Sequence, residues 1–156
     1  MASRYAEKTS TPVDRSKAEI ERILRRYGAT GFMYGWQENM AIIGFQMNQR
    51  TYQLRLPLPD ENDDAVVMTP TGRRRTGSVR EAALKQEERR RWRALALVIK
   101  ALLEAAASGI ATIDKLFLAH AMLPDGSTVG DWVDPQLDTI YRTKEMPRLL
   151  PGVSEE

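Results

Sequence analysis

The chain has 156 residues, of which 42% are apolar and 28% are charged, and it contains no cysteine. This length and apolar content predict one domain with its own hydrophobic core. The absence of cysteine excludes disulfides, zinc ribbons and thiol nucleophiles, and it suits a reducing cytoplasm. No stretch approaches the roughly 20 apolar residues of a membrane span, and the first residues lack an apolar signal segment. We therefore expect a cytoplasmic protein without a membrane partner.

Charge is sorted along the chain. Residues 73–100 hold ten Arg or Lys against three Glu, whereas residues 104–156 hold nine acids and four bases. The formal net charge of the whole chain is only +2. A chain sorted in this way presents one electropositive surface, and such a surface most often meets the phosphates of nucleic acid or the acidic face of a partner protein.

The first elements are a flexible arm and a helix. Residues 1–14 are polar and predict the arm. Ser16 and Glu19 have the spacing of a capping box, which predicts that a helix begins there. Its buried face repeats at helical spacing, and Gly28 supplies the left-handed stop; the apolar residues are Ile20, Ile23, Leu24 and Tyr27.

From Thr30 the apolar residues alternate, and this pattern predicts three strands up to about Leu58. The connections at residues 37–40 and 48–50 are short and polar, which favours an antiparallel meander. Four of the aromatic residues on these strands are candidates for base stacking. Alternation of this kind usually marks the core, although outward-facing rings could stack on unpaired bases; the four are Phe32, Tyr34, Trp36 and Tyr52.

Residues 60–78 have no sustained periodicity and predict a mobile basic loop. A long helix follows from about Ser78 to Ala107, with an apolar seam that starts at Trp92. Shorter helices at 113–122 and 134–141 predict a C-terminal extension that covers the long helix. The prolines of residues 146–156 predict an extended tail.

These elements predict an α+β fold. Its order is a helix, a three-stranded antiparallel meander, a long helix and a helical C-terminal extension, within a single domain that covers residues 15–145. The apolar stripe of the long helix and the unpaired edges of a three-stranded sheet predict a homo-oligomer.

The basic residues of the loop and the long helix are the candidate nucleic-acid-binding residues. Most are arginine, whose rigid fork matches phosphate oxygens in a bidentate way. The alternative is that these charges form only a solvated surface, as charge runs usually do. The candidate set is Arg73, Arg74, Arg75, Arg80, Lys85, Arg89, Arg90 and Arg93.

No catalytic constellation is visible in the sequence. His120 is the only histidine, and no serine lies in a recognisable nucleophile motif, so a structural role for His120 is favoured. The acids between Asp60 and Asp64 lack the spacing of a calcium loop, and no glycine-rich phosphate loop is present. We therefore expect no enzyme, no cofactor and no metal site.

Several segments resemble small uncharacterised proteins of phage and prophage origin. The segments are residues 2–5, 92–95, 98–100, 108–110, 117–120, 123–126 and 146–152. The resemblance implies a mobile-element context and the cytoplasm of a host cell, where small proteins serve DNA metabolism or counter host defence. It implies no activity and assigns a role to no residue.

The expected function is a non-enzymatic, phage-type, nucleic-acid-associated protein. The basic loop and helix would bind the phosphate backbone, of DNA rather than RNA, in recombination or replication. The alternative is a protein-binding inhibitor or adaptor, for example of host defence, that uses charge-complementary contacts with an acidic protein.

Overall fold

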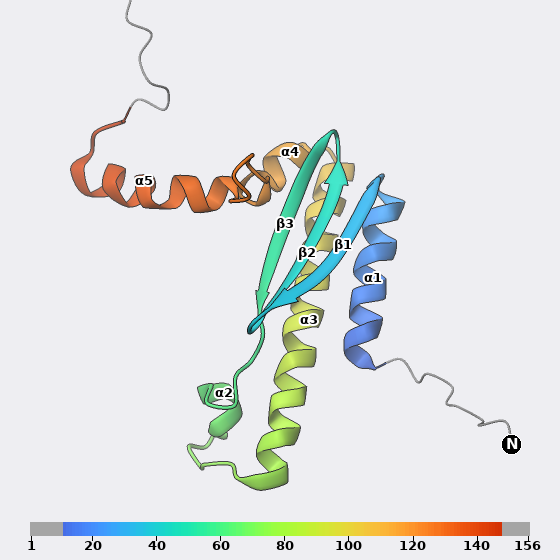
Figure 1. Ribbon diagram of the computed structural model, residues 1–156, viewed down its shortest axis with the longest axis vertical. Helices are drawn as coiled ribbons and strands as arrows, with labels where there is room; N and C mark the ends of the chain where they lie inside the picture. Colours follow the sequence, from blue (N-terminus) through green and yellow to red (C-terminus); the bar gives the residue numbers. More distant parts are fainter. Residues whose placement is uncertain (1–10, 148–156) are drawn as a thin grey trace, which may run out of the picture.

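The computed structural model describes residues 11–147, in which the chain forms five α-helices, one 3-10 turn and one three-stranded sheet (Figure 1). This arrangement confirms the predicted α+β class. In chain order the elements are α1 (Pro12–Arg26), β1 (Gly31–Gln37), β2 (Met40–Met47), β3 (Arg50–Pro57), α2 (Asp64–Val67), α3 (Gly77–Ala107), α4 (Ile113–Leu116), η1 (Leu118–His120) and α5 (Val129–Thr143).

The sheet is an antiparallel meander with strand order β1-β2-β3, as the alternation predicts. Phe45 of the central strand lies opposite Phe32 on one side and opposite Tyr52 on the other. Phe45 and Tyr52 are buried in the core, and Phe32 packs against it. The other face of the sheet carries Met33, which is 65% exposed, so the alternation separates a core face from an open face.

Helix α1 begins four residues before Ser16, and the predicted capping box at Ser16 is therefore wrong. Thr11 is the N-cap: its hydroxyl accepts a hydrogen bond from the Asp14 backbone N–H, and Asp14 bonds back to Thr11. Pro12 occupies the first helical turn, where its missing N–H is harmless. Gly28, with φ +102°, follows the helix end as expected.

Helix α3 runs along the core face of the sheet and packs beside α1 (Figure 1). The predicted seam is confirmed at Trp92, Leu95 and Ile99, which are at most 8% exposed, and Leu103 is buried beside it. Leu97 and Val98, which were expected to widen the seam, are instead exposed. The ring of Phe117, which follows α4, meets the Phe45 ring edge-on at 5.4 Å. The core thus joins α1, the sheet, α3 and the residues around α4.

Residues 60–78 contain more regular structure than the sequence pattern indicates. Helix α2 places Val66 fully in the interior, and Met68 forms an isolated bridge with Arg74. One buried valine therefore anchors a segment whose sequence predicts a mobile polar loop.

The C-terminal extension differs most from expectation. The predicted helix at 113–122 ends at Leu116, and after η1 the chain turns extended at Ala121, which bridges Tyr52 of β3. The last helix begins at Val129 rather than near Asp134, because Thr128 and Asp131 form a capping box that the sequence reading overlooked.

Helix α5 does not cover α3, and this part of the prediction is wrong. Helix α5 points away from the sheet and from α3, and it contacts the rest of the protein mainly at η1, next to β3 (Figure 1). None of its residues is buried, and Trp132 is 49% exposed. The seam of α3 is covered by the sheet, by α1 and by the residues around α4, so only that part of the extension packs on the long helix.

Two predicted segments fall largely outside the described residues. The arm at 1–14 is described only from residue 11, and residues 12–14 belong to α1. The tail at 146–156 is described only at Met146 and Pro147. Between residues 11 and 147 no helix combines the length and apolar character that a bilayer crossing requires.

The core assignment predicts a large difference between two neighbouring positions of α3. Ile99→Ala should lower the free energy of unfolding by about 2–5 kcal/mol, because a fully buried side chain is lost and a cavity remains. Leu97→Ala is the control, since Leu97 is 61% exposed, and it should change stability by less than about 0.5 kcal/mol. Urea denaturation measures both, and equal effects would show that the buried face is assigned wrongly.

Candidate nucleic-acid interface

The eight candidate residues divide into those that hold the fold together and those that do not. Arg75 belongs to the first group. Its Nη1 donates to the backbone carbonyl oxygens of Ala65 at 2.9 Å and Met68 at 2.6 Å, at the C-terminal end of α2. Those carbonyls have no helical partner of their own, so Arg75 satisfies them and caps α2.

Arg80 also serves the fold. Its Nε donates to the backbone carbonyl of Glu61 at 2.9 Å, and its Nη2 donates to the Asn62 side chain at 3.1 Å. Arg80 thereby ties the turn that precedes α2 to the second turn of α3. Sequence reasoning places both residues in the phosphate-binding set, but their guanidinium groups are already bound.

A cluster around Glu87 occupies two more arginines. Arg90 donates two hydrogen bonds of 2.8 Å to the Glu87 carboxylate, and Arg91 donates a third of 3.0 Å. Arg91 also bridges to Asp63, with 2.8 Å between Nη2 and Oδ2. The Glu87 side chain is only 8% exposed, so this cluster is the main buried electrostatic contact between α3 and the segment before α2.

The hydrogen bonds from Arg90, and then the one from Arg91, lower the pKa of Glu87 to about 2, although burial acts in the opposite direction. Glu87 is therefore ionised at neutral pH. The single carboxylate of Glu87 neutralises part of the charge of two arginines. One of them, Arg90, belongs to the set predicted from the sequence to bind phosphate.

The remaining basic residues have no such role. Lys85, Arg89 and Arg93 are exposed, and their side chains form no hydrogen bond or ion pair with any residue between 11 and 147. They repeat every four residues, so they lie along one side of α3. We call these three residues the basic row. The side chains of Arg73 and Arg74, in the turn before α3, are likewise exposed and have no partner within the described chain.

The basic row borders a hollow of about 370 Å³ between α3 and the start of α1. Arg89 and Arg93 line it together with Arg90, and Pro12 and Ser16 form its other wall. Three arginines thus line this hollow, and the guanidinium group of one of them, Arg90, is bound to Glu87. The arrangement suits an anion.

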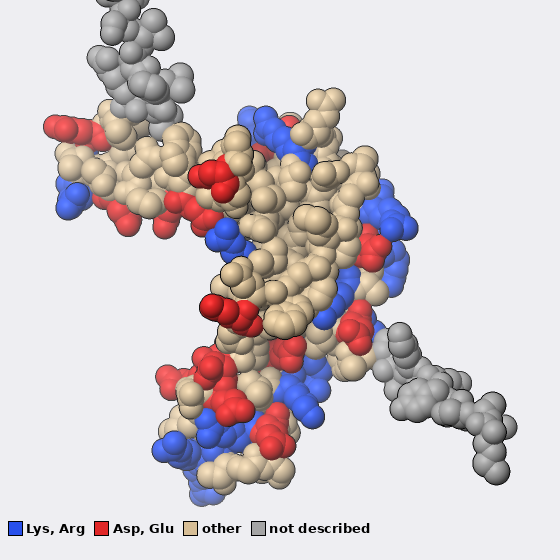
Figure 2. All heavy atoms as spheres, viewed as in Figure 1, with Lys and Arg blue, Asp and Glu red and all other residues tan. Residues whose placement is uncertain are grey.

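Charged side chains are unevenly spread over the molecular surface. Figure 2 shows basic and acidic side chains side by side over the foot of the molecule, where α2 and the first turns of α3 lie, and mainly acidic ones along α5. The open face of the sheet between them is largely uncharged. Acidic side chains therefore lie among the basic residues of the foot, as the Arg91–Asp63 pair shows, while α5 is mainly acidic on this face.

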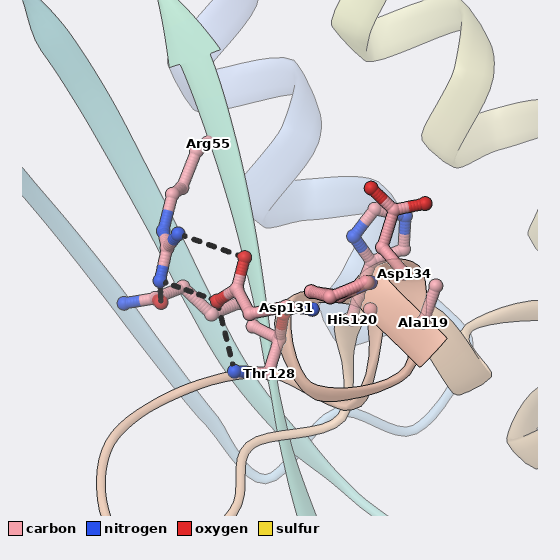
Figure 3. A pocket seen from close by; sticks show the side chains of 9 residues that line it. Arg55, Ala119, His120, Thr128, Asp131 and Asp134 are labelled. Carbon is pink, nitrogen blue, oxygen red and sulfur yellow. Dashed lines mark hydrogen bonds and ion pairs between the residues drawn. The ribbon is translucent and has the colours of Figure 1, made fainter. Parts of the chain in front are cut away.

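A second hollow, of about 480 Å³, lies where α5 meets β3 (Figure 3). Arg55 pairs with Asp131 across it at 3.1 Å, and Asp131 also caps α5 through Thr128. The backbone and side-chain hydrogen bonds between Thr128 and Asp131 lower the pKa of the Asp131 carboxyl group, and the charge of Arg55 lowers it further. Arg55 and Asp131 are thus engaged in holding α5 against β3.

His120 lines the same hollow, with Asp134 on the facing helix (Figure 3). Burial lowers its pKa, although a hydrogen bond with the Gln53 backbone acts in the opposite direction. A neutral imidazole bound to backbone fits the structural role favoured by the sequence. In the described part of the chain, no three His, Asp or Glu residues are grouped as a metal site requires.

The aromatic residues of the sheet only partly follow the core interpretation. Tyr52 is fully buried, but Tyr34 is 41% exposed and Trp36 is 72% exposed. Both lie on β1, which is an edge strand, and α1 covers only part of its length. The alternation of apolar residues does not show which strand lies at the edge of the sheet, because that depends on the topology.

The two roles of the arginine triplet can be separated by substitution. Arg75→Ala should lower the melting temperature by several degrees, because three carbonyl groups at the end of α2 lose their donor. Arg74→Ala removes the same charge from a side chain without a partner and should leave the melting temperature unchanged. Differential scanning calorimetry decides the point, and equal melting temperatures would remove the capping role.

The Glu87 cluster predicts a pH dependence of stability. Its carboxylate pKa is lower in the folded than in the unfolded protein, so its contribution is present above about pH 4.5 and is lost as the pH falls through about 2. Glu87→Gln should therefore cost about 1.5–3 kcal/mol at pH 7 and less at pH 2.5. Chemical denaturation at the two pH values measures this, and a cost that does not change with pH would contradict the assignment.

Comparison with known proteins adds no relative to these observations. No protein-family model, no curated protein and no solved structure matches the chain. The resemblance to small phage proteins therefore stays an expectation drawn from the quoted segments. The function has to be inferred from the geometry of the basic residues.

Proposed function

We propose that the protein binds the phosphate backbone of nucleic acid through the basic row, with Arg73 and Arg74 as secondary contacts. One observation carries the proposal: Lys85, Arg89 and Arg93 share one exposed side of α3 and have no acidic partner within residues 11–147. Other arginines of the same helix are bound to Glu87 and to backbone carbonyls. The fold thus leaves these three cations available.

The spacing of the row suits a repeating anion. Residues four apart on a helix are separated by about 6 Å along its axis. Phosphates of one strand follow each other about every 3.4 Å along a duplex axis, so each side chain of the row can reach a different phosphate. The hollow at Arg89 and Arg93 is open enough to admit a phosphate group between α3 and α1.

The row predicts binding without sequence preference. Backbone contacts supply affinity and position, whereas base edges supply sequence information. The row consists of three cations along an exposed helix side, with one amide side chain, Gln86, at the same hollow. The chemistry of the row therefore does not distinguish DNA from RNA. The preference for DNA, and a role in recombination or replication, come only from the resemblance to phage proteins.

Protein binding is the second candidate, and α5 favours it. Trp132, Leu137 and Tyr141 are 41–71% exposed on this helix, which packs on little else than η1. The acids of α5 would attract a basic partner rather than the acidic one expected from the sequence. An adaptor that uses α5 is compatible with phosphate binding by α3, since the two surfaces lie on different parts of the molecule (Figure 1).

The test compares two variants that lose the same charge. Lys85→Ala, Arg89→Ala and Arg93→Ala together should weaken binding to a fluorescent oligonucleotide and lower the slope of log K against log salt by about 2–3, since each lost contact removes about 0.9. The control combines Arg22→Ala, Arg25→Ala and Arg26→Ala, which lie exposed on α1. Its slope should fall by less than about 1.

Single-stranded and duplex DNA and an RNA of the same length are titrated at about 50 and 200 mM salt. Absence of binding to all three at the lower salt would overturn the proposal and leave protein binding as the leading candidate. Equal losses in both triple variants would show that net charge, rather than the basic row, determines affinity. Melting temperatures of the variants confirm that each remains folded.

A further inference from the structure

The two edges of the sheet are treated differently by the fold. The chain itself covers the edge of β3, because Ala121 bridges Tyr52 and the Met122 N–H donates to the Thr51 carbonyl at 2.8 Å. No described strand or bridge covers the outer edge of β1. Native proteins usually protect such an edge, since its backbone groups can pair with another chain.

Strand β1 carries none of the usual protection. It has the sequence GFMYGWQ, without a charged residue or proline, and its seven residues pair with β2 without a bulge. None of them is buried, and Met33 and Trp36 are 65% and 72% exposed. Large apolar groups thus stand along a free edge that lacks the lysines, prolines and bulges that prevent association.

We propose that β1 pairs in antiparallel fashion with β1 of a second copy of this chain, so that two sheets join into one of six strands. A second copy is the occupant because the strand is complementary to itself. Centring the twofold axis on Tyr34 places Met33 opposite Gly35 of the other copy and Phe32 opposite Trp36, and each of these pairs occurs twice.

In this register the exposed residues on both faces of β1 would gain partners. On the open face a large residue meets a glycine, and space at Gly35 is free because a Cβ built there meets no atom within 4 Å. On the core face Phe32 and Trp36 form aromatic cross-strand pairs, which stabilise antiparallel sheets. No like charges face each other along the strand, because the strand has none.

The twofold axis would be perpendicular to the plane of the sheet. Both copies of α3 would therefore lie on the same face of the six-stranded sheet. The assembly does not depend on the proposed phosphate binding. It would nevertheless present two basic rows on one side and thereby increase the number of phosphates that one particle contacts.

Association is tested by substituting exposed residues that carry little of the fold. Met33→Lys with Trp36→Lys places charges on the proposed edge contact and should raise the dimer dissociation constant at least tenfold. Leu97→Lys on α3 and Tyr141→Lys on α5 are matched controls, since these side chains are 61% and 71% exposed, and both should leave it unchanged. Sedimentation equilibrium from about 1 to 100 µM measures the constant.

For the unsubstituted chain we expect twice the chain mass of 17.7 kDa at the upper concentrations. A single-chain mass throughout would overturn the proposal. So would a dimer that Tyr141→Lys or Leu97→Lys dissociates while the β1 variant does not, because the contact would then belong to α5 or α3. Circular dichroism melting checks that the β1 variant is folded.

The register has its own test, which uses the absence of native cysteine. Met33→Cys protein mixed with Gly35→Cys protein should crosslink on oxidation, because opposite residues in an antiparallel pair have Cβ atoms about 5 Å apart. Each variant alone should crosslink much less, since like positions lie on a diagonal of the pair. Equal crosslinking in all three samples, or none in the mixture, would reject this register even if the protein is a dimer.

Discussion

Helix α3 is longer than the sheet on which it packs, and much of the structure depends on this mismatch. Its 31 residues span about 46 Å, whereas the eight-residue strand β2 spans about 26 Å. The buried seam of α3 extends from Trp92 to Leu103, so the helix before Trp92 projects beyond the sheet. That projecting part lacks a sheet to pack on, and it holds most of the basic residues.

The projecting part is stabilised by polar contacts in place of a second core. The Glu87 carboxylate collects Arg90 and Arg91, and Arg91 continues to Asp63. Arg75 and Arg80 bind backbone carbonyls of the neighbouring segment, while Val66 supplies its single buried side chain. A buried ion pair contributes modest net stability, but loss of one member leaves the others uncompensated. The arginines that remain outside this network are those proposed to bind phosphate.

Sequence patterns predict the fold well where one periodicity dominates. The alternation in residues 31–57 and the seam at Trp92, Ile99 and Leu103 give the strands, the pairing order and the long helix. The errors arise where two local signals compete. Ser16 and Thr11 both offer a helix start, and Thr11 prevails because Pro12 and Asp14 support it. Pro135 suggests a helix start, but Thr128 and Asp131 form the stronger cap.

The candidate site is predicted only as a set of eight basic residues. Sequence order cannot show that Arg75 and Arg80 meet carbonyls 7 to 19 residues away, or that Glu87 is buried beneath Arg90. The exposure of Trp36 and the direction of α5 likewise depend on which elements are neighbours in space. A charge run therefore identifies the region, and three-dimensional contacts decide which of its side chains remain available.

Helix α3 carries two kinds of arginine, those bound within the fold and those that we propose are available to phosphate. The most direct test of this division is the two-dimensional NMR spectrum of the arginine Nε–H groups during titration with a short oligonucleotide. The Arg89 and Arg93 signals should shift progressively, while those of Arg80 and Arg91 stay in place because their Nε–H groups already donate to Glu61 and Glu87. Shifts at Arg80 and Arg91 with none at Arg89 and Arg93 would contradict the account.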